Sequence, residues 1–367
     1  MILFHRKNLG TAPQLRSFGP SVIDNPTPLC LDDAKGTPMI PTLGANLTTP
    51  PPVLPEATAL DLLLTHWGLT GTLVPLTSER DLNYRVTAAQ GRFVFKLANL
   101  AEPEAVTQFQ TRALLHLEGS DLPVPRVVRT KAGATEIATP HGILRLLTYL
   151  EGQPLYSAPK SLAQRAAIGQ AAARLSLGLQ GFAHPASRQD LQWDIRHAAR
   201  LRPLLGDITA DLRPLCAQTL DVFEKTVLPH LPDCRWQVVH NDMNPHNLLT
   251  DPADPTRITG ILDFGDMVET PLICDMAVAA SYQVDPDAPL QSLATFARAY
   301  HATLPLTALE QSLFVPLTAA RMLTTLAIAS ARAARYPDNA PYILRNVPSA
   351  SAGLRALVGL NLSSLWG

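Results

Sequence analysis

Two short segments of the chain concentrate side chains that can bind a metal ion and move a proton. The first is His240-Asn-Asp-Met-Asn-Pro-His-Asn247 and the second is Ile261-Leu-Asp-Phe-Gly-Asp266, and each follows apolar residues that predict a strand. They fit the paired patterns H-x-D-x-x-x-x-N and D-F-G of a phosphotransfer site. Carboxylate and amide oxygens are ligands that Mg²⁺ takes, so Asp263 and Asn247 are the candidate metal ligands. Asp242 is the candidate base, which would accept a proton from an attacking hydroxyl group.

A lysine on a predicted strand completes this set. Lys96 lies in Phe-Val-Phe-Lys-Leu, on the second strand of a hairpin predicted for residues 82–86 and 93–97. Its cation would contact the α- and β-phosphates of a nucleoside triphosphate. A strand lysine alone is more often a solvated edge residue, but the order of lysine, catalytic loop and D-F-G indicates a kinase that phosphorylates a hydroxyl group. No glycine-rich loop precedes Lys96, so we expect backbone amides and hydroxyl groups of residues 77–81, including Ser78, to cover the phosphates.

The elements that must position these residues predict an α+β fold with two lobes. Residues 55–150 combine antiparallel strands with helices expected at 56–67 and 102–117, and should form a small nucleotide-binding N-lobe. After a hinge at residues 151–154, the sequence to residue 367 has mainly helical periodicity. We therefore expect a larger C-lobe that carries the catalytic loop and the substrate site.

The first 54 residues and the bulk composition add little about chemistry. Residues 1–54 are rich in proline without helical or strand periodicity, which predicts a flexible leader, and Met39 within it is an alternative translation start. The net charge of −1 gives no reason to expect nucleic acid or a membrane surface as a partner. No apolar run looks long enough to cross a bilayer, and four scattered cysteines look like buried thiols of a cytoplasmic protein. The oligomeric state, monomer or homodimer, is left open.

The chain resembles the aminoglycoside phosphotransferase and choline kinase superfamily, a branch of the protein-kinase-like fold, and within it the hydroxylysine kinase group. The similarity runs from about Pro55 to the C-terminus. It rests on Asn83-Tyr-Arg-Val86, Phe93 to Lys96, Leu122-Pro-Val-Pro-Arg126, His240 to Asn247, Gly260 to Asp266 and Asp275-Met-Ala277. The resemblance implies Mg²⁺ as cofactor, ATP or GTP as co-substrate, and a small molecule with a hydroxyl group as acceptor.

The resemblance also implies roles for particular residues. Asp242 is the base, His240 braces the catalytic loop, and Asp275 at a helix start holds that loop through its backbone. Many relatives pair the strand lysine with a glutamate, but here Gln110 stands at that position and would offer Lys96 a neutral acceptor. The remaining expected nucleotide contacts come from the N-lobe and the approach to the hinge: Asn83, Tyr149 and Leu150.

The acceptor is not identified by the sequence. An amino alcohol or aminoglycoside needs carboxylates for its ammonium groups, and an amino acid needs a cation for its carboxylate. The candidates are Asp194, Asp266 and Glu269 for an ammonium group, Arg196 or Arg200 for a carboxylate, and Trp193 for stacking. Two other readings stay open: a nucleotide-binding module without catalysis, suggested by Gln110, and a metal-dependent hydrolase built on the two histidines and two aspartates of the catalytic block.

Overall fold

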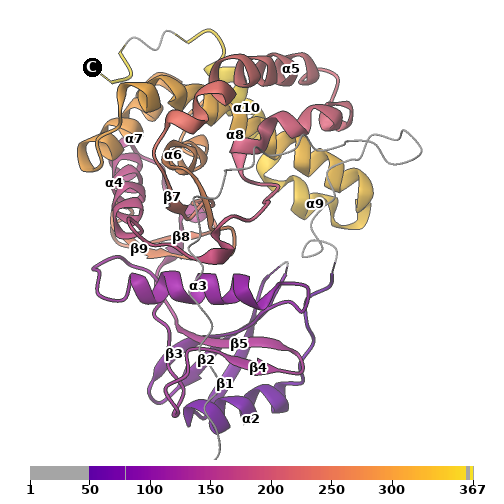
Figure 1. The fold of residues 1–367 in the computed structure, drawn as a ribbon, viewed down its shortest axis with the longest axis vertical. Helices are drawn as coiled ribbons and strands as arrows, with labels where there is room; N and C mark the ends of the chain where they lie inside the picture. Colours follow the sequence, from indigo (N-terminus) through magenta and orange to yellow (C-terminus); the bar gives the residue numbers. More distant parts are fainter. Residues whose placement is uncertain (1–48, 79, 361–363, 367) are drawn as a thin grey trace, which may run out of the picture. The chain divides into compact units, whose positions relative to one another are not determined.

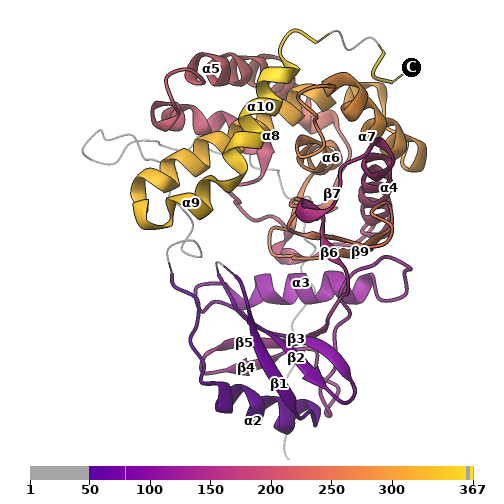
Figure 2. The same ribbon diagram turned by 180° about the vertical axis from the view of Figure 1, so that it is seen from behind.

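A computed structural model of the chain describes residues 49–78, 80–360 and 364–366, which belong to one compact unit, Ile40–Gly367. Residues 1–48 of the expected leader lie outside the described residues. At its end, Leu54 is already buried in the hydrophobic core of the N-lobe. The two-lobed α+β fold expected from the sequence is confirmed: an antiparallel sheet with two helices is followed by a mainly helical lobe (Figures 1 and 2).

The N-lobe is a five-stranded antiparallel sheet with helices on its two faces (Figure 1). Its elements are α2 (Glu56–Trp67), β1 (Gly71–Leu76), β2 (Leu82–Ala88), β3 (Gly91–Leu97), α3 (Glu104–His116), β4 (Ile137–Thr139) and β5 (Gly142–Thr148). The strand order is β1-β2-β3-β5-β4. Gly68 ends α2 with a φ of 68°, the left-handed conformation that favours glycine. Strand β5 ends at Thr148, so the predicted nucleotide contacts Tyr149 and Leu150 lie just after it.

Alternation along β3 decides which way Lys96 points. Phe95 and Leu97 are fully buried in the cluster that includes Ala59 and Leu63 of α2. Successive side chains of a strand point to opposite faces, so Lys96 lies on the other face of the sheet. Its register neighbours there are Asn83 on β2 and Arg145 on β5. The sheet therefore carries its polar residues on the face away from α2.

The C-lobe packs helices around short strand pairs. Its strands are β6 (Gln153–Pro154), β7 (Trp236–Val239), β8 (Leu248–Thr250), β9 (Ile258–Ile261) and β10 (Val268–Pro271). Its α-helices are α4 (Leu162–Gly178), α5 (Arg213–Val222), α6 (Leu272–Ser281), α7 (Pro289–Thr303), α8 (Ala308–Arg335), α9 (Ala340–Ile343) and α10 (Val347–Leu357). A π-helical turn spans Phe223–Val227, and 3₁₀ segments span Leu155–Ser157, Pro185–Ser187, Ile195–Asp207, Leu228–Asp233, Pro337–Asn339 and Leu344–Asn346.

The helix starts follow from their capping residues. At the start of α4, the Ser161 side chain accepts a hydrogen bond from the Gln164 backbone N–H. The Gln164 side chain donates to the Pro255 carbonyl, so only half of a capping box forms. A complete capping box starts α8, between Thr307 and Glu310. Residues Ile195–Asp207 form a 3₁₀ segment that begins after Asp194 and contains a proline.

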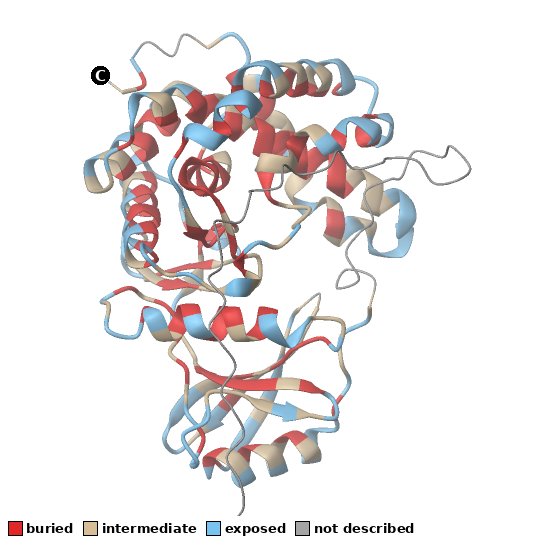
Figure 3. Ribbon diagram, in the orientation of Figure 1, coloured by how far each residue is buried: buried red, intermediate tan, exposed pale blue. Residues whose placement is uncertain are grey.

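The C-lobe core is built around α6 and α8, whose buried residues Figure 3 shows. By length and composition α8 could cross a membrane, contrary to the expectation that no such run exists. However, 83% of its apolar window is buried inside the protein, as in the core helix of a soluble protein. The described cysteines, Cys216, Cys234 and Cys274, are buried free thiols as expected, and Cys30 lies outside the described residues.

Candidate active site

The two polar loops are brought together by strand pairing. Residues 240–247 connect β7 to β8, and residues 262–267 connect β9 to β10. Strand β7 pairs with β10, and β8 pairs with β9, so both loops leave neighbouring strands. The Leu262 N–H also donates a hydrogen bond to the Asn247 carbonyl at 2.7 Å. Segments about 20 residues apart in the sequence thus form one rigid site.

His240 and Asp275 hold the catalytic loop from beneath. His240 is fully buried; its Nδ1 accepts the Asp242 N–H at 3.2 Å, and its Nε2 lies 2.9 Å from the Leu262 carbonyl. Burial lowers the pKa of His240, which keeps the ring neutral and suits these two bonds. The Asp275 Oδ1, in the first turn of α6, accepts the Asn241 N–H at 2.7 Å. The structure therefore has both residues where the resemblance places them.

Strained backbone occurs at two positions of this site. Among the described residues other than glycine, only Asn241 (φ 64°) and Asp263 (φ 56°) adopt a positive φ. Asparagine and aspartate tolerate the left-handed region better than most residues, yet glycine would be easier still. Asp263 keeps a carboxylate where the backbone favours glycine, a pattern seen at functional sites.

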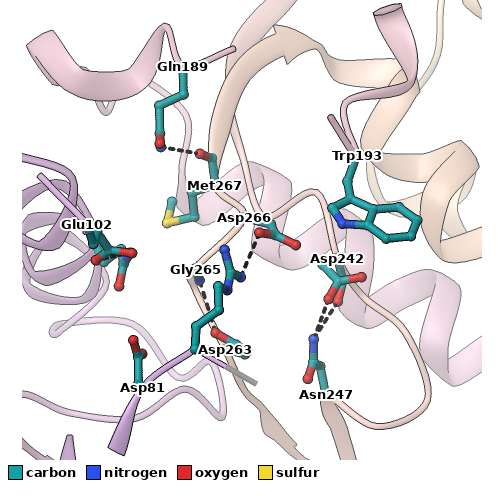
Figure 4. A network of polar contacts seen from close by, with 12 residues as sticks. Asp81, Glu102, Gln189, Trp193, Asp242, Asn247, Asp263, Gly265, Asp266 and Met267 are labelled. Carbon is teal, nitrogen blue, oxygen red and sulfur yellow. Dashed lines mark hydrogen bonds and ion pairs between the residues drawn. The ribbon is translucent and has the colours of Figure 1, made fainter. Parts of the chain in front are cut away.

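The proposed base and metal ligands are close together (Figure 4). The Asn247 Nδ2 donates to Asp242 Oδ2 at 2.8 Å and to the Asp242 carbonyl at 3.0 Å, while Asp263 Oδ1 accepts the Gly265 N–H. Within the described part of the chain, Asn247 Oδ1 and Asp263 Oδ2 accept no hydrogen bond. One amide oxygen and one carboxylate oxygen are thus left for a hard cation, and this donor set fits Mg²⁺.

Lys96 has a carboxylate partner that the sequence analysis missed. Its Nζ lies 2.7 Å from Asp81 Oδ2, and both side chains are largely buried. Burial by itself would lower the pKa of Lys96, but Asp81 and Asp263 outweigh it and raise that pKa. The expected contact with Gln110 is absent: Gln110 Oε1 accepts from Arg145 at 2.9 Å, and its Nε2 donates to Glu102. The charge that Gln110 lacks is supplied by the loop before β2.

A single cavity of about 470 Å³ contains most of the predicted site. The residues expected from the sequence that line it are Ser78, Asn83, Lys96, Gln110, Trp193, Asp242, Asn247, Asp263 and Asp266. Both lobes contribute to this lining, because Lys96 comes from β3 and Asp263 from the β9–β10 loop. The cavity is large enough for a small-molecule ligand.

The other predicted contacts lie outside the lining of this cavity. Asp194 is buried and pairs with Arg196 at 2.8 Å, where it caps the following 3₁₀ segment. Glu269 is engaged by Arg188 at 3.2 Å and by the Ser187 hydroxyl. These contacts explain their carboxylates as structural. Arg200, the second arginine considered for binding a substrate carboxylate, pairs with Asp190.

Tyr149 and Leu150 are likewise absent from the cavity lining. The Tyr149 ring lies against the guanidinium groups of Arg85 and Arg92, at 6.0 and 5.9 Å from its centroid. Its N–H donates to the Arg92 carbonyl. Tyr149 and Leu150 lie just after β5, and the structure gives them no contact with the cavity.

Arg321 on α8 is a functional candidate that sequence reasoning passed over. Its Nη2 lies 3.2 Å from Asp242 Oδ1 and 3.3 Å from the Tyr282 hydroxyl, and its guanidinium stacks 5.2 Å from the Trp193 ring centroid. Burial and repulsion by Asp266 raise the pKa of Asp242 to about 7, against the opposing effect of Arg321. Only its place on α8, 79 residues after Asp242, could have signalled it, and that spacing predicts nothing.

The hydrolase reading is not supported by this geometry. Across residues 49–78, 80–360 and 364–366 there is no cluster of three or more histidine, cysteine, aspartate or glutamate side chains able to hold a metal ion. Both ring nitrogens of His240 are already hydrogen-bonded. His246 instead packs its ring against Tyr156, at a centroid distance of 4.6 Å.

Comparisons with known proteins identify the family of this chain. Residues 72–310 match the model of a phosphotransferase enzyme family. Hydroxylysine kinase from Mus musculus is 28% identical over 325 residues, which cover 80% of this chain and 86% of the relative. Among solved structures, a microcompartment-associated aminopropanol kinase has a TM-score of 0.64 at 19% identity and covers 82% of this chain and 100% of that one. Amicoumacin kinase in complex with AMP-PNP and Ca²⁺ has a TM-score of 0.62 at 13% identity, and the match covers 85% and 97% of the two chains.

Proposed function

Since the chain belongs to the phosphotransferase enzyme family and is a small-molecule kinase, we propose that it transfers the γ-phosphoryl group of ATP or GTP to a hydroxyl group of an amino acid. One observation carries this proposal. Asp242, Asn247, Asp263 and Lys96 line the same cavity, with oxygens of Asn247 and Asp263 left for a cation. The complex of a structural neighbour with AMP-PNP and Ca²⁺ is in keeping with a nucleotide and a divalent cation here.

In the proposed reaction each residue acts at a stated group. Asn247 and Asp263 would hold Mg²⁺, which supplies charge neutralisation at the phosphate oxygens. Lys96, fixed by Asp81, binds non-bridging oxygens of the α- and β-phosphates. Asp242 accepts the acceptor's hydroxyl proton as the new P–O bond forms and the bond to the β,γ-bridging oxygen breaks, which releases the nucleoside diphosphate.

The far wall of the cavity favours an acceptor with a carboxylate. That wall comes from α8 and the segment after it, and its charged residues are Arg321, Arg332 and Arg345. Of the three acidic candidates for an ammonium group, only Asp266 lines the cavity. An aminoglycoside, which needs several carboxylates, therefore fits less well than a hydroxy amino acid. The name of the curated relatives, hydroxylysine kinase, agrees with this class.

A release assay for ADP or GDP tests the proposal. The panel contains hydroxylysine, homoserine, choline, ethanolamine, methylthioribose and several aminoglycosides, each with ATP and with GTP. We expect turnover with hydroxy amino acids, and a much higher KM for 1,5-diaminopentan-2-ol, which is hydroxylysine without its carboxyl group. Asp242→Asn, as control, should lower kcat by several orders of magnitude and retain nucleotide binding. Nucleotide binding without turnover of any acceptor by the wild type would contradict the proposal.

We also propose that the protein works in the cytoplasm, as a monomer or homodimer. Its described cysteines are free and buried, which suits a reducing compartment. Cell fractionation and light scattering of the purified protein would check both statements.

A further inference from the structure

Arg80 stands in the loop between β1 and β2, the loop that also supplies the partner of Lys96. Its backbone is fixed by Asn99, a buried residue whose Nδ2 donates to the Arg80 carbonyl at 2.9 Å. The Asn99 N–H donates to Asp81 Oδ1, and the Asp81 N–H donates to Ser78 Oγ. The root of the Arg80 side chain is therefore as firmly placed as the Lys96–Asp81 pair beside it.

The Arg80 guanidinium reaches across to the loop that carries the metal ligand. Its Nη2 lies 2.9 Å from Asp266 Oδ1, although the two residues are 186 positions apart. Gly265 makes room for it, since a Cβ added there would lie 3.2 Å from Arg80 Nη2 and 3.0 Å from Asp263 Oδ1. Asp266 and Asp263 both raise the pKa of Arg80, so it is a permanent cation beside the proposed metal site.

The charges at this point favour a movement of the guanidinium when substrate binds. A divalent cation on Asp263 would lie beside Arg80 and repel it, which weakens the pair with Asp266. The triphosphate that comes with this cation offers anionic oxygens, and a planar guanidinium can bind two of them at once. Arg80, Asp242, Asp263 and Asp266 line the same cavity, so a nucleotide bound there with its metal ion would lie next to the guanidinium.

We propose that Arg80 is a catalytic residue, which leaves Asp266 when metal and nucleotide bind and contacts the γ-phosphoryl group as it transfers. This inference rests on the proposed function. During transfer, negative charge spreads over the three equatorial oxygens and the leaving β,γ-bridging oxygen, and Arg80 stabilises that charge. Arg80 takes no proton: the proton of the acceptor hydroxyl goes to Asp242, and the electron pair of the broken P–O bond leaves with the nucleoside diphosphate.

The test uses the full chain and three variants. Arg80→Gln removes the charge, Arg80→Lys keeps a charge without the planar fork, and Arg129→Gln is the control, which removes an N-lobe arginine that pairs with Glu118 outside the cavity lining. We expect Arg80→Gln to lower kcat by about 10³-fold, the lower end for arginines that act on transferring phosphoryl groups, with KM for ATP changed less than about tenfold. The kcat of Arg80→Lys should lie between those of the wild type and Arg80→Gln, and Arg129→Gln should keep kcat within about threefold of wild type.

A binding measurement separates a catalytic role from a structural one. ADP with Mg²⁺ and aluminium fluoride mimics the transferring phosphoryl group. Calorimetry should therefore show a lower Kd for ADP when the wild type is titrated in the presence of aluminium fluoride. Arg80→Gln should lose this decrease in Kd while it binds ADP alone with wild-type affinity and keeps the wild-type melting temperature. If Arg80→Gln keeps kcat within about threefold, or if Arg129→Gln lowers kcat as much as Arg80→Gln does, the inference is wrong. A wild type without turnover on any acceptor would instead refute the proposed function.

Discussion

Asp275 carries a buried charge under the catalytic loop, and removing that charge should change how stability depends on pH. The carboxyl group is 1% exposed, and within the described ranges it has no ion-pair partner. Burial raises its pKa to about 6, partly offset by the hydrogen bond from Asn241. Asp275→Asn keeps an oxygen for that N–H and removes the charge.

The magnitude follows from linkage. A carboxyl group whose pKa is about 6 when folded and 3.8 when unfolded binds its proton more tightly in the folded state. Its contribution to stability is therefore fully present below pH 3.8 and is lost as the pH rises through 6. The full difference is about 3 kcal/mol, of which about 1.4 kcal/mol falls between about pH 5 and pH 8. Any cost of the new amide is the same at each pH, so it cancels when differences are compared.

Urea unfolding of wild type and Asp275→Asn from about pH 5 to pH 8 measures this effect. The free energy of unfolding of Asp275→Asn minus that of the wild type should rise by about 1.4 kcal/mol over this range. Turnover should stay within about tenfold, because the loop keeps its hydrogen bond. Asp275→Ala is the contrasting variant, because it leaves the Asn241 N–H unpaired. Its free energy of unfolding should lie about 1–3 kcal/mol below that of Asp275→Asn at every pH. A difference between Asp275→Asn and wild type that does not change with pH would refute the reasoning.

Three further outcomes follow from the structure. Asp81→Asn should raise the KM for ATP about tenfold, because Lys96 loses its carboxylate partner, and steady-state kinetics would show it. Since the pKa of Asp242 is about 7, kcat/KM for ATP, which reports the free enzyme, should fall as the pH drops below about 7; a flat profile would contradict this. Gly169→Ala should cost about 1–3 kcal/mol in urea unfolding, because an added Cβ would lie 2.4 Å from a backbone oxygen of α7; Gly206→Ala, with no atom within 4 Å, is the control.

Much of the catalytic block could be read from the sequence because its function is local. His240, Asp242 and Asn247 lie within eight residues, and Asp263 follows on the next strand connection. Such short-range patterns reflect a loop geometry that few other sequences share. The two-lobed fold also follows from periodicity, since the apolar residues of β3 alternate and those of α3 recur at helical spacing.

The charge pairing was decided by the tertiary structure. Lys96 pairs with Asp81 rather than with Gln110, because the pairing of β2 with β3 places Asp81, just before β2, next to the end of β3. Gln110 instead accepts a hydrogen bond from Arg145. Asp194, a substrate candidate by sequence, became a helix cap. The Lys96–Asp81 and Arg145–Gln110 contacts join different strands and a helix, and the energy of a charge depends on its neighbours and burial rather than on its sequence context. The sequence thus determined which chemistry the chain can perform, and the packing of the two lobes decided which residues surround it.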